Sequence, residues 1–301
     1  MLVVAAPAQP AEKPRSVNNI VYKTVGKRQL MLNLHYPSEG KAPYPTAMVI
    51  PGGGWRRGTR RSRNAMMLAR LLNRDGVVCA TIDIRHAPKD THPAQIEDCR
   101  RAMQWLRAHA SKHQLDPKRM MACGMSAGGH LAALLGAEGD AADPESKDPI
   151  ARMSTRPIMV LSLFGPMDLA DEGAATNAMG RALVRGFLGI AEIDAAALKH
   201  ARSASPVHRI APGAPPFLFI HGDRDGLVPE EQSKLMVRAL DKLEVPNKLF
   251  VVSGGHGDFV FRLSAAKKGE EPEYWRKSRA FMKRHWRDRG RADKEKAASG
   301  Q

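Results

Sequence analysis

The sequence predicts an α/β fold, in which a mostly parallel eight-stranded sheet carries helices on both faces. Strand-like apolar runs alternate with helix-like runs along most of the chain. The first two strand-like runs are joined by "GKRQ", which is typical of a hairpin turn. An antiparallel start followed by strand–helix alternation favours a sheet whose later strands are parallel, because each crossover helix must lie on a face.

Eight runs are typical of strands because they are short and apolar and lie between turn residues. They cover residues 18–25, 30–36, 46–50, 77–84, 119–123, 158–164, 217–221 and 248–252.

Helical periodicity separates most of these runs. The stretch "NAMMLARLLNRDG" (64–76) places its Met and Leu side chains on one face and stops at Gly76. The stretch 92–110 has an apolar stripe from Ile96 to Ala110, and Pro93 is suited to its first turn. Further helices are predicted directly after Ser126 and around 176–189, 229–243 and 272–287.

One α/β domain is expected over residues 16–288. Residues 1–15 form an Ala/Pro-rich leader, which is compatible with a remnant export signal and a secreted or periplasmic protein, or with an unstructured cytoplasmic leader. Residues 289–301 are small and charged, as in a disordered tail. Lid elements are expected within 139–204, where 139–157 has the composition of a loop.

The composition excludes some functions. A net charge of +16, from 47 Lys and Arg against 31 Asp and Glu, favours an anionic polymer as partner, although a solvated basic surface explains it equally simply. No zinc-finger spacing or RNP motif supports nucleic-acid binding, and no apolar run approaches the roughly 20 residues of a membrane span. Cys79, Cys99 and Cys123 lie in apolar runs without a CxxC motif, which predicts core packing.

The stretch "GMSAGGH" (124–130) contains a G-x-S-x-G motif between a predicted strand and a predicted helix. In this context Ser126 is predicted to be a nucleophile on a sharp turn. By itself the motif also fits a small residue in a glycine-rich turn.

Three more loops follow strand-like runs. "PGGGWRRG" (51–58) can turn backbone N–H groups toward a developing oxyanion, or form a tight turn. "HGDRDGLVP" (221–229) supplies Asp223 and Asp225, which fit turn chemistry or the orientation of a histidine. A metal site on the same loop has no further ligand cluster to support it. His256 lies in the glycine-rich loop "SGGHGDF" (253–259).

Together these loops predict a catalytic triad, because Ser126, Asp225 and His256 follow one another in the order of the nucleophile-elbow enzymes. His256 would take the proton of Ser126, and Asp225 would hold the imidazole. Asp225 is preferred to Asp223 because it precedes Gly226 and stands deeper in the loop. The expected oxyanion donors are the N–H groups of Gly52, Gly53 and Ala127.

The chain resembles the α/β-hydrolases, and more narrowly the carbohydrate-esterase and hormone-sensitive-lipase-like group that includes acetyl xylan and feruloyl esterases. "PGGGW", "IRHAP", "GMSAGGHLAA", "HGDRDGLVP" and "GGHGDF" carry the resemblance, over roughly residues 45–260. The resemblance implies the same triad and oxyanion donors, and no metal or organic cofactor. Trp55, which follows the three glycines, is a candidate substrate contact. The chain departs from many relatives in having Pro51 where they have His before the three glycines.

The expected function is hydrolysis of short acyl esters, acetyl above all, on a small molecule or a polysaccharide. A serine peptidase of the prolyl-oligopeptidase type shares the fold and the triad order, but the chain has no β-propeller domain. A non-catalytic binding module of the same fold is the other alternative.

Overall fold

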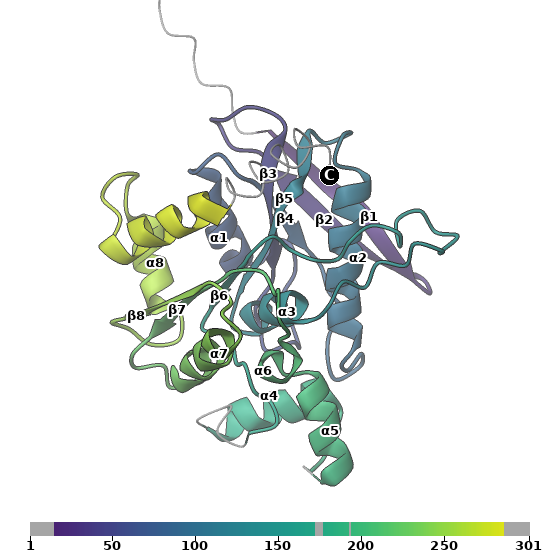
Figure 1. Cartoon of the computed structure of the whole chain (residues 1–301), viewed down its shortest axis with the longest axis vertical. Coiled ribbons are helices and arrows are strands. Elements are labelled where there is room, and N and C mark those ends of the chain that lie inside the picture. The colour runs from purple at the N-terminus through teal and green to yellow at the C-terminus, as the bar shows by residue number, and fades with distance from the viewer. Residues whose placement is uncertain (1–14, 172–176, 193, 286–301) are drawn as a thin grey trace, which may run out of the picture.

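A single eight-stranded sheet runs through the computed structural model, which describes residues 15–171, 177–192 and 194–285 (Figure 1). The strand order is β1-β2-β4-β3-β5-β6-β7-β8. The pairs β1/β2 and β2/β4 are antiparallel and all later pairs are parallel, as the sequence predicts. The strands are β1 (Ser16–Val25), β2 (Arg28–His35), β3 (Tyr44–Ile50), β4 (Val78–Ile82), β5 (Leu115–Met125), β6 (Val160–Leu163), β7 (Phe217–Gly222) and β8 (Asn247–Val252).

Helices cover both faces of the sheet, so the layer prediction is confirmed (Figure 1). The helices are α1 (Arg63–Asn73), α2 (Ala94–Ala108), α3 (Ala127–Ala137), α4 (Ala178–Leu188), α5 (Ala195–Ser203), α6 (Pro206–Arg209), α7 (Glu231–Lys242) and α8 (Asp258–Ala265). Helices α1 and α8 pack together on one face, and α2, α3, α6 and α7 lie on the other. Residues 273–285 are also helical.

Two apolar cores lie between the sheet and the helices, one on each face. One contains Leu131 of α3 and Phe217 of β7, and the other contains Leu68 of α1 and Trp275. Every residue of β4, β6 and β7 is buried, because a parallel strand in this fold is covered on both faces. All three cysteines are buried and unpaired, as predicted for core residues.

The predicted strands and main helices are all present, but three helices were not predicted. Helices α5, α6 and α8 are short, and the sequence around them lacks a long apolar stripe. Residues 139–157 contain no strand or helix, as expected. Helices α4 and α5 lie within the predicted lid, at the lower end of Figure 1.

The predicted leader and tail fall almost wholly on residues 1–14 and 286–301, outside the described residues. Within the described part of the chain, no helix combines the length and apolar character that a membrane span requires.

The parallel strands β3, β5, β7 and β8 all end at the same edge of the sheet, where ligands bind in open α/β folds. The loops that follow them carry the three glycines, Ser126, Asp225 and His256 respectively. The topology therefore brings together four segments that are far apart in the sequence.

Candidate active site

Ser126 occupies a sharp turn between β5 and α3. Its backbone angles, φ 53° and ψ −123°, are strained for a residue with a side chain. Glycines on either side make the turn sterically feasible. A Cβ on Gly128 would stand 2.3 Å from the carbonyl oxygen of Ile50, and a Cβ on Gly124 would stand 2.4 Å from the carbonyl carbon of Gly128. The turn leaves Ser126 partly exposed and lining a cavity.

The side chains of Ser126, His256 and Asp225 form a continuous chain of hydrogen bonds. His256 Nε2 lies 2.9 Å from Ser126 Oγ, and His256 Nδ1 lies 2.7 Å from Asp225 Oδ2. The Asp225 carboxylate accepts a hydrogen bond from Nδ1–H, which leaves Nε2 free to accept the proton of the serine hydroxyl. The geometry is that required for serine activation by a histidine base.

Asp225 is held as a carboxylate on the loop after β7. Its Oδ1 accepts hydrogen bonds from the backbone N–H groups of Leu227 and Val228, both at 2.9 Å. Burial raises the pKa of Asp225, but hydrogen bonds from His221, His256 and the backbone outweigh it and hold the pKa well below its ordinary value. The group therefore remains ionised at neutral pH.

The neighbouring Asp223 does not reach His256. Its Oδ1 accepts the backbone N–H of Gly254 at 2.9 Å, and its side chain is about half exposed. Asp223 thus joins the loop after β7 to the loop after β8, as turn aspartates often do. The structure brings Asp225, and not Asp223, to the serine–histidine pair.

His221, at the end of β7, lies behind Asp225 and is fully buried. Its Nε2 lies 3.0 Å from the carbonyl oxygen of Val228 and 3.4 Å from Asp225 Oδ2, and its Nδ1 lies 2.7 Å from Ser233 Oγ. Two acceptors face Nε2, so its N–H points toward the carbonyl oxygen of Val228 and the Asp225 carboxylate. This contact of His221 was not predicted from the sequence, where the only signal for it is its place at the start of "HGDRDGLVP". Among the described residues, no group of three His, Cys, Asp or Glu side chains is arranged to hold a metal ion.

The glycine loop after β3 lies against the turn that carries Ser126. Gly53 and Gly54 line cavities that Ser126 also lines, whereas Gly52 is buried and lines neither. The N–H of Ala127 is the first in α3 and has no partner within the helix. Gly53, Ala127 and Gly54, which sequence reasoning missed, therefore border the cavities at Ser126, whereas Gly52 packs against the carbonyl oxygen of Met125, one residue before the serine.

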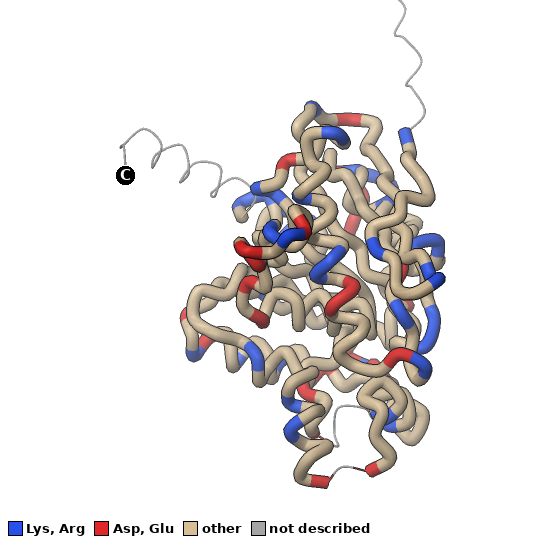
Figure 2. Tube along the Cα trace, turned by 90° about the vertical axis from the view of Figure 1, so that its right-hand side faces the viewer, with Lys and Arg blue, Asp and Glu red and all other residues tan. Residues whose placement is uncertain are grey.

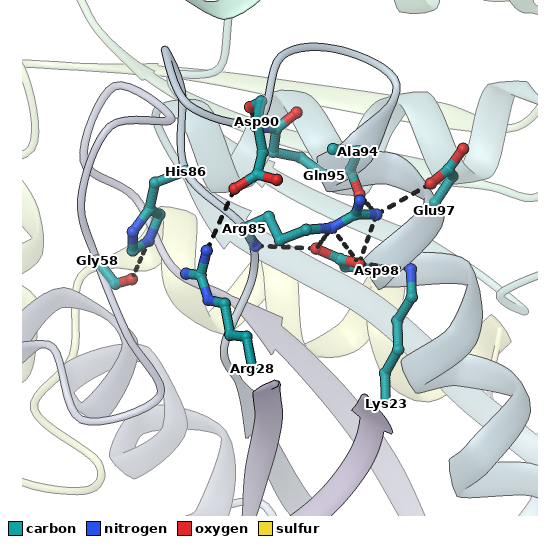
Figure 3. Close-up of polar contacts among 10 residues, drawn as sticks. All are labelled: Lys23, Arg28, Gly58, Arg85, His86, Asp90, Ala94, Gln95, Glu97 and Asp98. Atoms are coloured by element: carbon teal, nitrogen blue, oxygen red, sulfur yellow. Dashed lines mark hydrogen bonds and ion pairs between the residues drawn. The ribbon is translucent and has the colours of Figure 1, made fainter. Parts of the chain in front are cut away.

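This loop is braced by the turn after β4 rather than by a side chain at position 51. His86 Nε2 lies 2.8 Å from the carbonyl oxygen of Gly58 (Figure 3). The N–H of Ala87 also donates to the carbonyl oxygen of Trp55 at 2.9 Å. These contacts hold in place the loop that begins at Pro51.

The turn that carries His86 is itself fixed by a buried ion-pair network (Figure 3). Asp98 of α2 accepts hydrogen bonds from the backbone N–H of Arg85 at 2.8 Å and from its Nε at 3.0 Å. The ammonium group of Lys23 lies 2.7 Å from the same carboxylate, and Arg85 also pairs with Glu97 at 2.9 Å. Because Asp98 is fully buried and has several donors, it holds the turn in one position.

Trp55, a predicted substrate contact, is only 4% exposed. Its ring stacks on Phe187 with centroids 4.5 Å apart, and its Nε1–H donates to His130 Nδ1 at 3.2 Å. Most of its surface therefore packs in the core, although it also lines the smaller of two cavities at Ser126.

Two cavities of different size meet at Ser126. The larger, of about 740 Å³, is lined by residues that include Arg56, Arg57, His256 and Phe261. The smaller, of about 40 Å³, is lined largely by apolar groups, among them Leu183 and Val184 of α4. The predicted lid segment thus contributes α4 to the walls of both cavities.

Known proteins share this sequence and architecture. The BD-FAE family model matches residues 32–240. Esterase LipC of Mycobacterium tuberculosis is 35% identical over 222 residues, covering 71% of this chain and 53% of LipC. The propionate-bound esterase 2 of Thermogutta terrifontis superposes with a TM-score of 0.64 at 27% identity, over 84% of this chain and 87% of that one.

The fold also matches the acetyl ester-xyloside bifunctional hydrolase of Caldicellulosiruptor lactoaceticus. The TM-score is 0.73 at 24% identity, over 91% of this chain and 98% of that one. The chain spans about half the length of the curated relatives it matches. Because the family model covers more than half of the sequence, and the sheet and elbow have the expected arrangement, the chain belongs to the BD-FAE family of α/β-hydrolases.

Proposed function

We propose that this protein is a serine carboxylic ester hydrolase, in which Ser126 is the nucleophile, His256 the general base and acid, and Asp225 the residue that orients the histidine. The observation that carries the proposal is the hydrogen-bond chain from Asp225 through His256 to Ser126. Similarity to esterases, including LipC, supports the same reaction class.

The proposed reaction has two halves. Ser126 Oγ attacks the acyl carbon as His256 Nε2 takes the hydroxyl proton, and the carbonyl oxygen becomes an oxyanion. Backbone N–H groups at Ala127 and Gly53, with Gly54 added, are proposed to stabilise this charge. Collapse breaks the ester C–O bond, and His256 returns the proton to the departing alcohol. Water then attacks the acyl-serine with His256 again as base, releasing the carboxylic acid and restoring Ser126.

The smaller cavity is proposed to hold the acyl group. Its 40 Å³ has space for about three water-sized groups, which suits acetyl and excludes a long chain. The larger cavity is open enough for a bulky alcohol such as a sugar residue of a polysaccharide. The net charge of +16 supports an anionic polymer as one class of molecule that bears the ester group.

The test uses p-nitrophenyl esters of increasing acyl length beside acetylated xylan. The wild type should prefer acetate to octanoate, and a serine-directed phosphonate should label Ser126. Ser126→Ala should lower the rate by about a millionfold, because no acyl-enzyme can form. Full activity in this variant would overturn the proposal.

Two alternatives are separated in the same experiment. A peptide anilide hydrolysed faster than the acetyl ester would favour the serine-peptidase reading. Absence of both turnover and phosphonate labelling in the folded wild type would favour a non-catalytic binding module.

A further inference from the structure

Two arginines line the larger cavity without a carboxylate partner. Arg56 and Arg57 are exposed, and the described residues place no Asp or Glu within ion-pair distance of either guanidinium group. Among the described residues, no Asp or Glu lines this cavity. Arg57 lies next to the proposed oxyanion loop, because its backbone N–H donates to the carbonyl oxygen of Gly53 at 3.3 Å. Within the described part of the chain, the cavity therefore has a positive wall close to Ser126 that no carboxylate neutralises.

Other arginines near the cavity have a carboxylate or an aromatic ring as partner. Arg60, only a few positions further along the chain, pairs with Asp83, and Arg262, the residue after the lining residue Phe261, pairs with Asp258 at 3.3 Å. Arg63 stacks over the ring of Phe261, 4.8 Å from its centroid. Arg56 and Arg57 have neither kind of contact within the described part of the chain.

The remainder of the cavity strengthens their effect on a bound anion. Its floor and walls are largely apolar, including Met67, Met125 and Phe164. A cleft with one sign of charge and low-dielectric walls concentrates the field and raises the local concentration of opposite charge. A guanidinium group also presents paired N–H donors that match the oxygens of a carboxylate or sulfate.

We propose that the larger cavity selects esters whose alcohol portion carries an anionic oxyacid group, a carboxylate or a sulfate, which Arg56 and Arg57 bind while a short acyl group enters the smaller cavity. This inference rests on the proposed function of Ser126. It concerns local recognition and not the overall charge, since Lys and Arg are spread over the described trace and interleaved with Asp and Glu (Figure 2). The net charge would attract any polyanion to the protein surface, whereas Arg56 and Arg57 would bind an anionic group beside the ester bond that is cleaved.

The test compares three acetyl esters of similar shape: methyl 4-acetoxybenzoate, which is neutral, and 4-acetoxybenzoate and 4-acetoxybenzenesulfonate, which are anionic. The measured quantity is the ratio of kcat/KM for each anionic ester to that for the neutral ester, so that differences among enzyme preparations cancel. In the Arg56→Gln/Arg57→Gln variant this ratio should fall about tenfold through loss of charge-assisted hydrogen bonds. The Arg56→Lys/Arg57→Lys variant should recover part of this ratio because the positive charges remain. The recovery should be incomplete because an ammonium group lacks the paired N–H donors of a guanidinium group.

A matched control removes the same net charge elsewhere. Arg202 and Arg276 are exposed and line neither cavity at Ser126, so Arg202→Gln/Arg276→Gln should leave the ratio within about twofold of wild type. An unchanged ratio in the Arg56/Arg57 variant, or an equal fall in the control, would overturn the inference. The carboxylate and sulfonate arms show which oxyacid is preferred.

The two proposals fail in different ways. If Ser126→Ala hydrolyses all three esters at the wild-type rate, the proposed function is wrong. If Ser126 is required but the substitution of Arg56 and Arg57 leaves the kcat/KM ratio of anionic to neutral ester unchanged, only the proposed anion selectivity is wrong.

Discussion

Replacing Asp225 by Asn tests the catalytic assignment with little change in shape. The Asn amide oxygen can still accept the backbone N–H groups that now bind Oδ1, so the loop should keep its fold. The NH₂ group then replaces Oδ2, which lies 2.7 Å from His256 Nδ1. An amide NH₂ donates and does not accept, so the imidazole would have to turn its unprotonated nitrogen to position 225 and carry its proton on Nε2.

That tautomer cannot accept the proton of Ser126. The expected loss in kcat is up to about 10,000-fold, since an equivalent change in a serine protease triad has this effect. The loss corresponds to about 5 kcal/mol of transition-state stabilisation, at 1.36 kcal/mol for each factor of ten. The assay is p-nitrophenyl acetate hydrolysis, with circular dichroism to verify folding.

Asp223→Asn is the matched control, because the same substitution two residues away preserves the acceptor for the Gly254 N–H. It should retain activity within about threefold of wild type. A near-normal Asp225→Asn enzyme beside a dead Asp223→Asn enzyme would refute the assignment of the acid, though not the esterase proposal.

The pKa of Asp225 gives a second readout. Because this pKa lies below its ordinary value in the folded protein, the carboxylate stabilises the fold above about pH 4 and the contribution is lost as the pH falls further. The Tm of the wild type should therefore decrease more steeply below pH 4 than the Tm of Asp225→Asn. Parallel Tm curves for the two proteins would contradict this account of the carboxylate.

Two further predictions concern the walls of the site. His86→Ala removes the donor to the carbonyl oxygen of Gly58 and should lower kcat about tenfold with little change in KM, while His86→Gln, which keeps an N–H donor, should recover part of the loss. An unchanged kcat in His86→Ala would show that the loop needs no brace there. Val184→Ala enlarges the smaller cavity and should raise the butyrate-to-acetate ratio of kcat/KM about threefold or more. If the ratio stays constant, the acyl group does not occupy that cavity.

The sequence by itself determined most of the fold, because its signals are local. Strand-like apolar runs appear at their predicted places in the sheet, and the turn glycines around Ser126 are required by contacts as close as 2.3 Å. Short helices such as α8 escaped prediction because an apolar face of only Phe259, Val260 and Leu263 is too short to show a helical period in the sequence.

Only the tertiary structure decided which candidate groups meet. Asp223 and Asp225 have the same side chain in the same loop, and sequence position alone separates them weakly, whereas the folded loop aims one at Gly254 and the other at His256. The three glycines after β3 are alike in the sequence, but in the folded chain Gly52 is buried, whereas Gly53 and Gly54 line the cavity. The brace at His86 depends on a contact across 28 positions, and side-chain contacts over such separations leave no periodic trace in a single sequence.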